Sequence, residues 1–198
     1  MKKTFRPVLS GKTLPTVSKA SKKNNKRKGL IIVFTGSGKG KTSAAIGTAF
    51  RALGWDYQVA VVQFMKGKWR TGENVAAKRF RRQLKIYSSG DGFTWECRDR
   101  MRHVRSAMQA WKKAEAFLRD RKHQLVILDE INYAMHYGFL KPRRVIQALK
   151  GKSFMKHVIL TGDAAPPGII RCADLVTEMR CIKHPYQRDI QAQRGIEY

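Results

Sequence analysis

The sequence predicts an α/β domain with a mainly parallel central sheet flanked by helices. Short runs of branched apolar residues, typical of strands buried on both faces, alternate with segments of helical periodicity. A glycine-rich loop follows the first of these runs, and a later run ends in two adjacent acids. Strands that alternate with helices form parallel sheets. Loops that follow the strands are therefore expected to meet at one edge of the sheet, where ligands bind.

The first strand and helix are predicted within residues 29–48. Leu30–Phe34 is an all-apolar run that predicts a buried strand. Thr42–Leu53 is rich in alanine and contains no proline, which predicts a helix ended by Gly54. Residues 36–40, which join the two, contain three glycines. Strand, glycine-rich loop, Lys-Thr and helix together form the phosphate-binding P-loop arrangement.

Each part of this loop has a chemical role toward phosphates. Glycines let backbone N–H groups approach phosphate oxygens, and the helix N-terminus adds a partial positive charge. Lys41 would place a full charge on the phosphates and Thr42 a hydroxyl on magnesium. The usual spacing puts its first glycine at position 35, where this chain has Thr35, so the loop is a variant. A turn without a ligand is the alternative, which the Lys-Thr pair disfavours. The candidate phosphate-binding residues are Gly36, Ser37, Gly38, Lys39, Gly40, Lys41 and Thr42.

Further strands and helices follow in alternation. Apolar runs predict strands at Gln58–Phe64, Leu84–Tyr87, Gln124–Glu130, His157–Leu160 and Leu175–Met179. Helices are expected at Glu73–Arg82, Asp99–Arg119, Pro142–Lys150 and Ile169–Ala173. In the longest helix the apolar positions, which recur every three or four residues and predict a packing face, are Met101, Val104, Met108, Trp111, Ala114 and Leu118. His103 and His123 are expected at the surface.

The strand Gln124–Glu130 ends in Asp129 and Glu130, which is the Walker B pattern. A carboxylate at the tip of a strand near a P-loop can hold magnesium directly or through water. The alternative is that Asp129 caps a loop. Two adjacent acids in so basic a chain favour a functional role.

The loop Ser88–Glu96 is rich in glycine and carries two large aromatic residues, Phe93 and Trp95. Composition leaves two interpretations open. The rings can cover the domain's own core, or they can bind a partner or ligand at the surface.

Composition limits the class of protein. The chain has 198 residues and a net charge of +27. Residues 1–28 contain ten cations and no acid, and the rest of the chain still has 31 cations against 14 acids. Such a balance favours polyanionic partners: a nucleic acid, an anionic membrane surface or a polyphosphate substrate.

Three distant cysteines without metal-binding spacing are typical of reduced thiols in a cytoplasmic protein. No apolar run approaches membrane-spanning length.

Residues 1–28 form a basic tail without helical or strand periodicity, which predicts disorder. Two alternatives are an arm that becomes ordered on a partner or over the active site, and a transit peptide. The tail is rich in lysine rather than arginine, which disfavours a transit peptide. Residues 29–198 are expected to form one domain.

Several short motifs in order make the chain resemble the ATP:corrinoid adenosyltransferases of the P-loop type. They are residues 33–42, 62–69, 72–73, 92–96, 128–133, 161–162, 165–167, 173–180, 183–186 and 192–197. Among the departures, Asp189 stands where related sequences tend to have glycine.

The resemblance implies a RecA-like P-loop NTPase fold, a homodimer and a defined reaction. The reaction would transfer the 5′-deoxyadenosyl group of ATP to the cobalt(I) of a corrinoid, such as cobalamin or cobyrinic acid a,c-diamide. Tripolyphosphate would be released, in adenosylcobalamin biosynthesis or salvage. It also implies that ATP lies across the loop in the reverse sense, which fits the variant spacing.

The resemblance also implies roles for individual residues. Lys41 and a Mg²⁺ (or Mn²⁺) ion would neutralise the leaving triphosphate, with Thr42 and Glu130 as metal ligands and Asp129 as their hydrogen-bond partner. Phe93 and Trp95 would pack beneath the corrin ring and exclude its lower ligand, which eases reduction of cobalt(II). An electron donor such as a flavoprotein would supply cobalt(I).

Two other functions are compatible with the same motifs. A P-loop ATPase that binds nucleic acid would account for the charge, although no helicase motif is visible and the Gly-Phe-Thr-Trp loop has no role in it. Nucleic-acid binding through the basic tail is possible but not expected. A corrinoid or nucleotide carrier without turnover is the third interpretation.

Overall fold

The computed structural model describes residues 27–65, 71–89 and 100–198. These residues contain a six-stranded sheet in the order β3-β2-β4-β5-β1-β6, in which every pair of neighbours is parallel. The strands are β1 Ile31–Thr35, β2 Val59–Gln63, β3 Leu84–Ser88, β4 Leu125–Asp129, β5 His157–Thr161 and β6 Leu175–Glu178. The α-helices are α1 Lys41–Leu53, α2 Gly72–Ala77, α3 Arg100–Arg119, α4 Ile131–His136, α5 Pro142–Lys150 and α6 Pro167–Cys172. Short 3-10 helices lie at Lys78–Phe80 and Pro185–Arg188.

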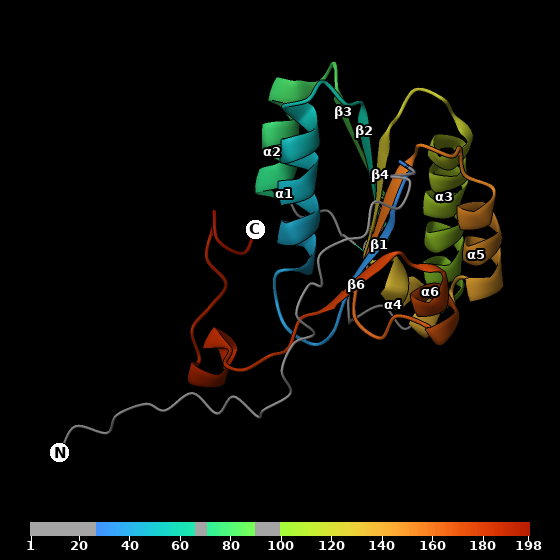
Figure 1. Cartoon of the computed structure of the whole chain (residues 1–198). Helices are drawn as coiled ribbons and strands as arrows, with labels where there is room; N and C mark the ends of the chain where they lie inside the picture. Colours follow the sequence, from blue (N-terminus) through green and yellow to red (C-terminus); the bar gives the residue numbers. More distant parts are fainter. Residues whose placement is uncertain (1–26, 66–70, 90–99) are drawn as a thin grey trace, which may run out of the picture.

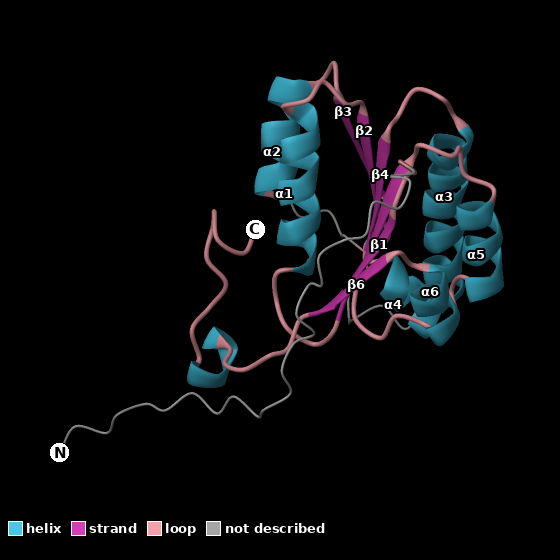
Figure 2. Cartoon of the chain, viewed as in Figure 1, coloured by secondary structure: helices cyan, strands magenta, loops and turns pink. Residues whose placement is uncertain are grey.

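The helices cover both faces of the sheet (Figures 1 and 2). Helices α1 and α2 lie on one face, and α3, α4, α5 and α6 lie on the other. The predicted α/β class with a parallel sheet flanked by helices is confirmed.

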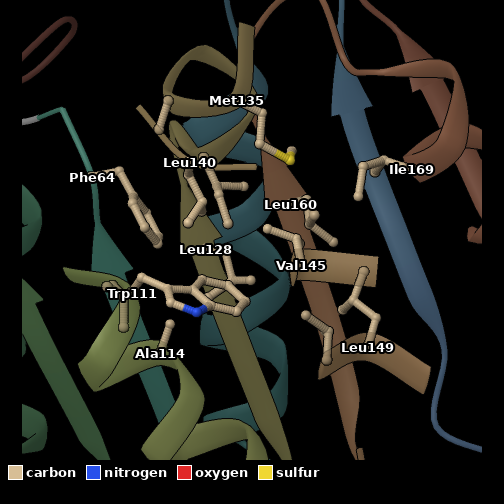
Figure 3. Close-up of a cluster of buried hydrophobic side chains, with 14 of the residues drawn as sticks. Phe64, Trp111, Ala114, Leu128, Met135, Leu140, Val145, Leu149, Leu160 and Ile169 are labelled. Carbon is tan, nitrogen blue, oxygen red and sulfur yellow. The ribbon is translucent and has the colours of Figure 1, made fainter. Parts of the chain in front are cut away.

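Two buried clusters hold the layers together, and the strand residues alternate between them. In β4, Val126 and Leu128 pack with α3 to α6, whereas Leu125 and Ile127 pack with α1. This alternation follows from the two-residue period of a strand. Because both faces are covered, all five residues of β4 are buried, as the continuous apolar run predicted. Figure 3 shows the larger cluster, with Trp111 and Ala114 from α3 beside Leu128.

The predicted strands and α-helices agree with the structure, within a residue or two at their ends, except in two places. The helix expected at Glu73–Arg82 ends as an α-helix at Ala77 and continues as a 3-10 turn to Phe80. The chain must turn there because Gln83 accepts a hydrogen bond from the N–H of Val59 (2.7 Å) as β3 joins the sheet. The short helix α4, directly after β4, was not predicted.

The packing face predicted for α3 is wrong in its first half. Met101 and Met108 are 61% and 37% exposed, whereas Ala107 and Ala110 are buried together with Trp111. Small side chains allow the helix to approach the sheet closely, so burial follows the alanines instead of the larger methionines.

The surface position predicted for His123 is also wrong. His123 is 4% exposed because it lies against Phe117 and its Nδ1 is 2.6 Å from Asp120 Oδ2. The buried Lys156 ammonium donates to Asp120 Oδ1 (3.0 Å) and to the Asp120 carbonyl (2.7 Å), and so caps the end of α3. His103 is half-buried and stacks on Phe139 with ring centres 5.6 Å apart.

Candidate functional site

The predicted phosphate loop and the two predicted acids lie at the carboxyl edge of the sheet. The loop follows β1, and Asp129 ends β4. Strand β5 separates β1 from β4, so its terminal residue, Thr161, stands between the two motifs. The site is therefore assembled from the ends of three adjacent strands and the start of α1.

Two glycines allow the loop to follow its path. Gly36 and Gly40 have φ angles of +94° and +105°, a region that residues with a side chain rarely adopt. A Cβ atom at Gly36 would lie 2.4 Å from the Met179 carbonyl oxygen, and one at Gly38 would lie 2.7 Å from the Arg180 carbonyl carbon. The N–H of Gly38 donates to Met179 O (2.7 Å). The loop is thus packed against the chain that leaves β6, which sets its curvature.

Lys41 is held inside this curve. Its ammonium group donates to the carbonyl oxygens of Gly36 (2.6 Å) and Gly38 (2.7 Å), and the residue is 9% exposed. An ammonium group has three donors. Two of them fix the side chain at the centre of the loop.

Asp129 connects the phosphate loop with its neighbouring strands. Its Oδ1 accepts hydrogen bonds from Thr42 Oγ1 and Thr161 Oγ1, both at 2.8 Å, and its Oδ2 lies 3.3 Å from Gln63 Nε2. Asp129, Thr161 and Gln63 are fully buried. These donors orient the carboxylate toward the start of α1.

Glu130 follows in the turn to α4, with a φ of +63°. Its N–H donates to Thr161 Oγ1 (2.9 Å), so Thr161 links the backbone of Glu130 to Asp129. Burial raises the pKa of Tyr133 above its usual value, and the nearby carboxylates of Glu130 and Asp163 raise it further. Carboxylates from the turn after β4 and from the loop after β5 therefore lie close to Tyr133.

The donor set fits a small hard cation. Thr42 gives its hydroxyl proton to Asp129, so its lone pairs face away from that bond, and Glu130 offers carboxylate oxygens. Mg²⁺ prefers oxygen ligands and is usually held by one or two carboxylates together with substrate phosphates. The described part of the chain has no cluster of three or more His, Cys, Asp or Glu residues that could hold a metal ion.

The C-terminus of the chain also reaches the phosphate loop. Glu197 forms an ion pair with Lys39, and its side chain is 18% exposed. Arg194 and Tyr198, on either side of Glu197, line a cavity of about 460 Å³ against α2. The end of the chain therefore joins the loop to the first turn of α2.

The structure brings most of the predicted site residues together. Residues 36–42 form one loop, and Asp129 contacts it through Thr42. Glu130 is adjacent, whereas Phe93 and Trp95 lie outside the described residues. Sequence reasoning assigned no role to Thr161, Gln63 or Glu197. All three lie within segments that carry the family resemblance, residues 62–69, 161–162 and 192–197, and that membership was the signal that could have found them.

Comparisons with known proteins agree on one family. The family model described as "ATP:corrinoid adenosyltransferase BtuR/CobO/CobP" matches residues 27–198. A protein named corrinoid adenosyltransferase from Pseudomonas aeruginosa is 44% identical over 171 residues, which cover 86% of this chain and 84% of the relative. Relatives with the same name from Sinorhizobium sp and Escherichia coli (strain K12) are 47% and 39% identical. These alignments cover 86% of this chain in both cases, and 81% and 86% of the respective relatives.

Proposed function

Because the chain belongs to the ATP:corrinoid adenosyltransferase family, we propose that its phosphate loop, residues 36–42, binds the triphosphate of ATP. The reaction of this family transfers the 5′-deoxyadenosyl group of ATP to the cobalt(I) of a corrinoid and releases tripolyphosphate. The chain is thus a transferase whose substrates are ATP and a corrinoid. The alternative, a P-loop ATPase that acts on nucleic acid, is not favoured.

Lys41 is the residue that supports this assignment most directly. Cobalt(I) attacks the 5′-carbon with its electron pair, and the C5′–O bond breaks with its electrons moving to the triphosphate. The protein therefore needs no nucleophile or general base of its own. It needs positive charge beside the leaving group, and the ammonium of Lys41 is fixed at the centre of the loop by two carbonyls.

A magnesium ion, or manganese in its place, would be held by Thr42 and Glu130, with Asp129 orienting Thr42. The ion would supply further charge neutralisation on the triphosphate. Asp129 is placed for this orienting role because three side chains already donate to it.

The first experiment mixes the protein with ATP, Mg²⁺ and chemically reduced cob(I)alamin and follows the visible spectrum. A light-sensitive alkylcobalamin spectrum is expected. Lys41→Ala should lower the rate about 100-fold or more because it removes charge from the leaving group. Lys141→Ala, which removes an exposed lysine at the start of α5, is the matched control and should keep the wild-type rate. A Lys41→Ala variant with a near-normal rate would reject this placement of the triphosphate.

Phe93 and Trp95 are proposed to pack beneath the corrin ring. Excluding the lower ligand and water would make cobalt(II) easier to reduce. Alanine at either position should therefore slow the reaction from cob(II)alamin more than the reaction from cob(I)alamin. The comparison uses the same spectral assay with both forms of the corrinoid. Equal losses from the two forms would mean that the rings serve only binding or folding.

The remaining partners are proposed from chemistry and exposure. A one-electron donor such as a flavoprotein would provide cobalt(I). A homodimer is supported by β6, an edge strand whose four residues are all exposed, including Leu175 (44%) and Val176 (40%). Sedimentation equilibrium tests this assembly.

A cytoplasmic location is supported by the use of ATP and by the free thiols of Cys172 and Cys181. Within the described residues, no helix combines the length and the apolar character needed to cross a membrane.

A further inference from the structure

Exposed aromatic rings gather at the amino edge of the sheet, opposite the phosphate loop. This edge carries the turn from α1 to β2 and the turn into β3, at the upper end of the molecule in Figure 1. Phe50 is 68% exposed, Trp55 is 78% exposed and Tyr57 is 37% exposed. The adenosyltransferase reaction uses none of these side chains.

Two of these rings pack against another ring. Phe50 meets Phe80 edge-on with ring centres 6.3 Å apart, and Tyr57 stacks on His157 at 6.4 Å. A hollow of about 210 Å³ lies beside the second pair, and its lining includes Trp55, Tyr57 and His157 together with Arg51. The edge therefore presents aromatic surfaces around an indentation that a planar group can enter.

Exposed cations flank these rings. The cations are Arg51, Lys78, Arg79, Arg81, Arg82 and Lys85. Within the described residues, none of the six forms an ion pair with a carboxylate. Asp56, an acid in the same turn as Trp55, accepts a hydrogen bond from Gln83 Nε2 (3.1 Å). The local charge is thus strongly positive and uncompensated.

A surface with both exposed rings and unpaired cations suits a polyanion that carries phosphates and planar groups. Phosphates are attracted by lysine and arginine, and every nucleobase has a flat face that stacks on an aromatic side chain. An acidic protein or an anionic membrane would also attract the cations, but only a single-stranded nucleic acid carries a phosphate and an exposed planar base at every residue. We propose that the amino-edge surface, made of these rings and cations, binds single-stranded nucleic acid.

This activity would be separate from the adenosyltransferase site. The phosphate loop lies at the carboxyl edge, so a bound strand need not contact ATP or the corrinoid. The proposal also gives a role to charge that catalysis does not use, since the chain carries +27 overall.

The test measures binding of a fluorescently labelled 20-nucleotide oligo(U) RNA to the full chain by anisotropy, between 50 and 200 mM salt. Binding that weakens steeply with salt is expected. Trp55→Ala should weaken binding about tenfold because it removes one stacking surface. Tyr186→Ala, which removes an 80% exposed ring near the C-terminus, is the matched control and should bind as the wild type does.

A second pair of variants tests the cations. Arg81→Ala with Arg82→Ala should reduce the slope of log affinity against log salt by about 1.4, the value for two phosphate contacts on a single strand. Lys141→Ala with Arg143→Ala removes the same charge from α5 and should leave the slope unchanged. All variants should keep full adenosylation of cob(I)alamin, which shows that they are folded.

Three results would overturn the proposal. The first is no binding of the RNA at 50 mM salt. The second is equal loss in both double variants with no effect of Trp55→Ala, which would indicate unspecific attraction by charge. The third is Trp55-dependent binding to phosphatidylglycerol vesicles without binding to RNA, which would assign the surface to a membrane. Failure of adenosylation in the wild type would be a separate result, since the binding assay contains neither ATP nor corrinoid.

Discussion

Single side chains at the site act through hydrogen bonds to residues far away in the sequence. Thr42 and Asp129 are 87 positions apart, and Asp129 and Thr161 are 32 apart, yet three hydroxyl and carboxylate groups meet at one point. Thr42 and Asp129 were predicted because each belongs to a motif with known spacing. Thr161 was given no role because a threonine at the end of an apolar strand has no distinctive local pattern.

Thr161→Val tests this buried network. Valine keeps the shape of threonine but leaves Asp129 without one donor and the Glu130 N–H without its acceptor. We expect the free energy of unfolding to fall by about 1–3 kcal/mol, and the adenosylation rate to fall with it. Urea unfolding and the cobalamin assay measure the two effects. Thr161→Ser retains the hydroxyl and should recover most of both. A valine variant as stable and active as the wild type would show that the network is dispensable.

At the scale of elements, the parallel sheet also sets the chemistry of its amino edge. β1 and β5 are neighbours, and at their start the N–H of Leu30 donates to Nδ1 of His157 (3.1 Å). That bond requires a ring nitrogen without a proton. Burial lowers the pKa of His157, and the nearby Lys152 ammonium lowers it further.

His157 should therefore make stability depend on pH. The unfolded chain takes up a proton on this histidine near pH 6.5, whereas the folded chain resists it. The free energy of unfolding should decrease as the pH falls through 6.5, since the unfolded state binds more protons. His157→Gln keeps an acceptor but does not titrate, and should show a smaller decrease between pH 7.5 and 5.5 in urea unfolding. His136→Gln, at an exposed position, serves as control. The same decrease in both variants would contradict this role for His157.

For the whole molecule, net charge is the dominant electrostatic property. A chain with a charge of +27 repels itself in the folded state more than in the expanded unfolded state. At 0.1 M salt the Debye length is about 10 Å, so added salt weakens the repulsion between charges that are farther apart than this.

The melting temperature is therefore expected to rise between 20 and 200 mM NaCl. The variant Lys78→Glu with Arg82→Glu lowers the net charge by four and should show a smaller rise. Circular dichroism during heating measures both. A melting temperature that falls with salt would mean that attractive ion pairs, such as Arg144 with Glu115, outweigh the repulsion.

The sequence by itself determined the α/β class, the order of strands and helices apart from α4, the position of the glycine-rich loop and the two acids at the end of β4. Each of these depends on local information: apolar runs, glycine spacing and a few adjacent polar residues. The motifs also carried the resemblance that the comparisons with known proteins confirm.

Only the tertiary structure decided which side chains those elements bring together. It buried His123 and exposed Met101, because burial depends on what packs opposite a helix. It placed Thr161 on Asp129 and Glu197 on Lys39, and it collected Trp55 and Tyr57 at the edge opposite the phosphate loop. These contacts join residues that are far apart in the sequence. The local periodicity that reveals a strand or a helix does not specify which other elements pack against it in the folded protein.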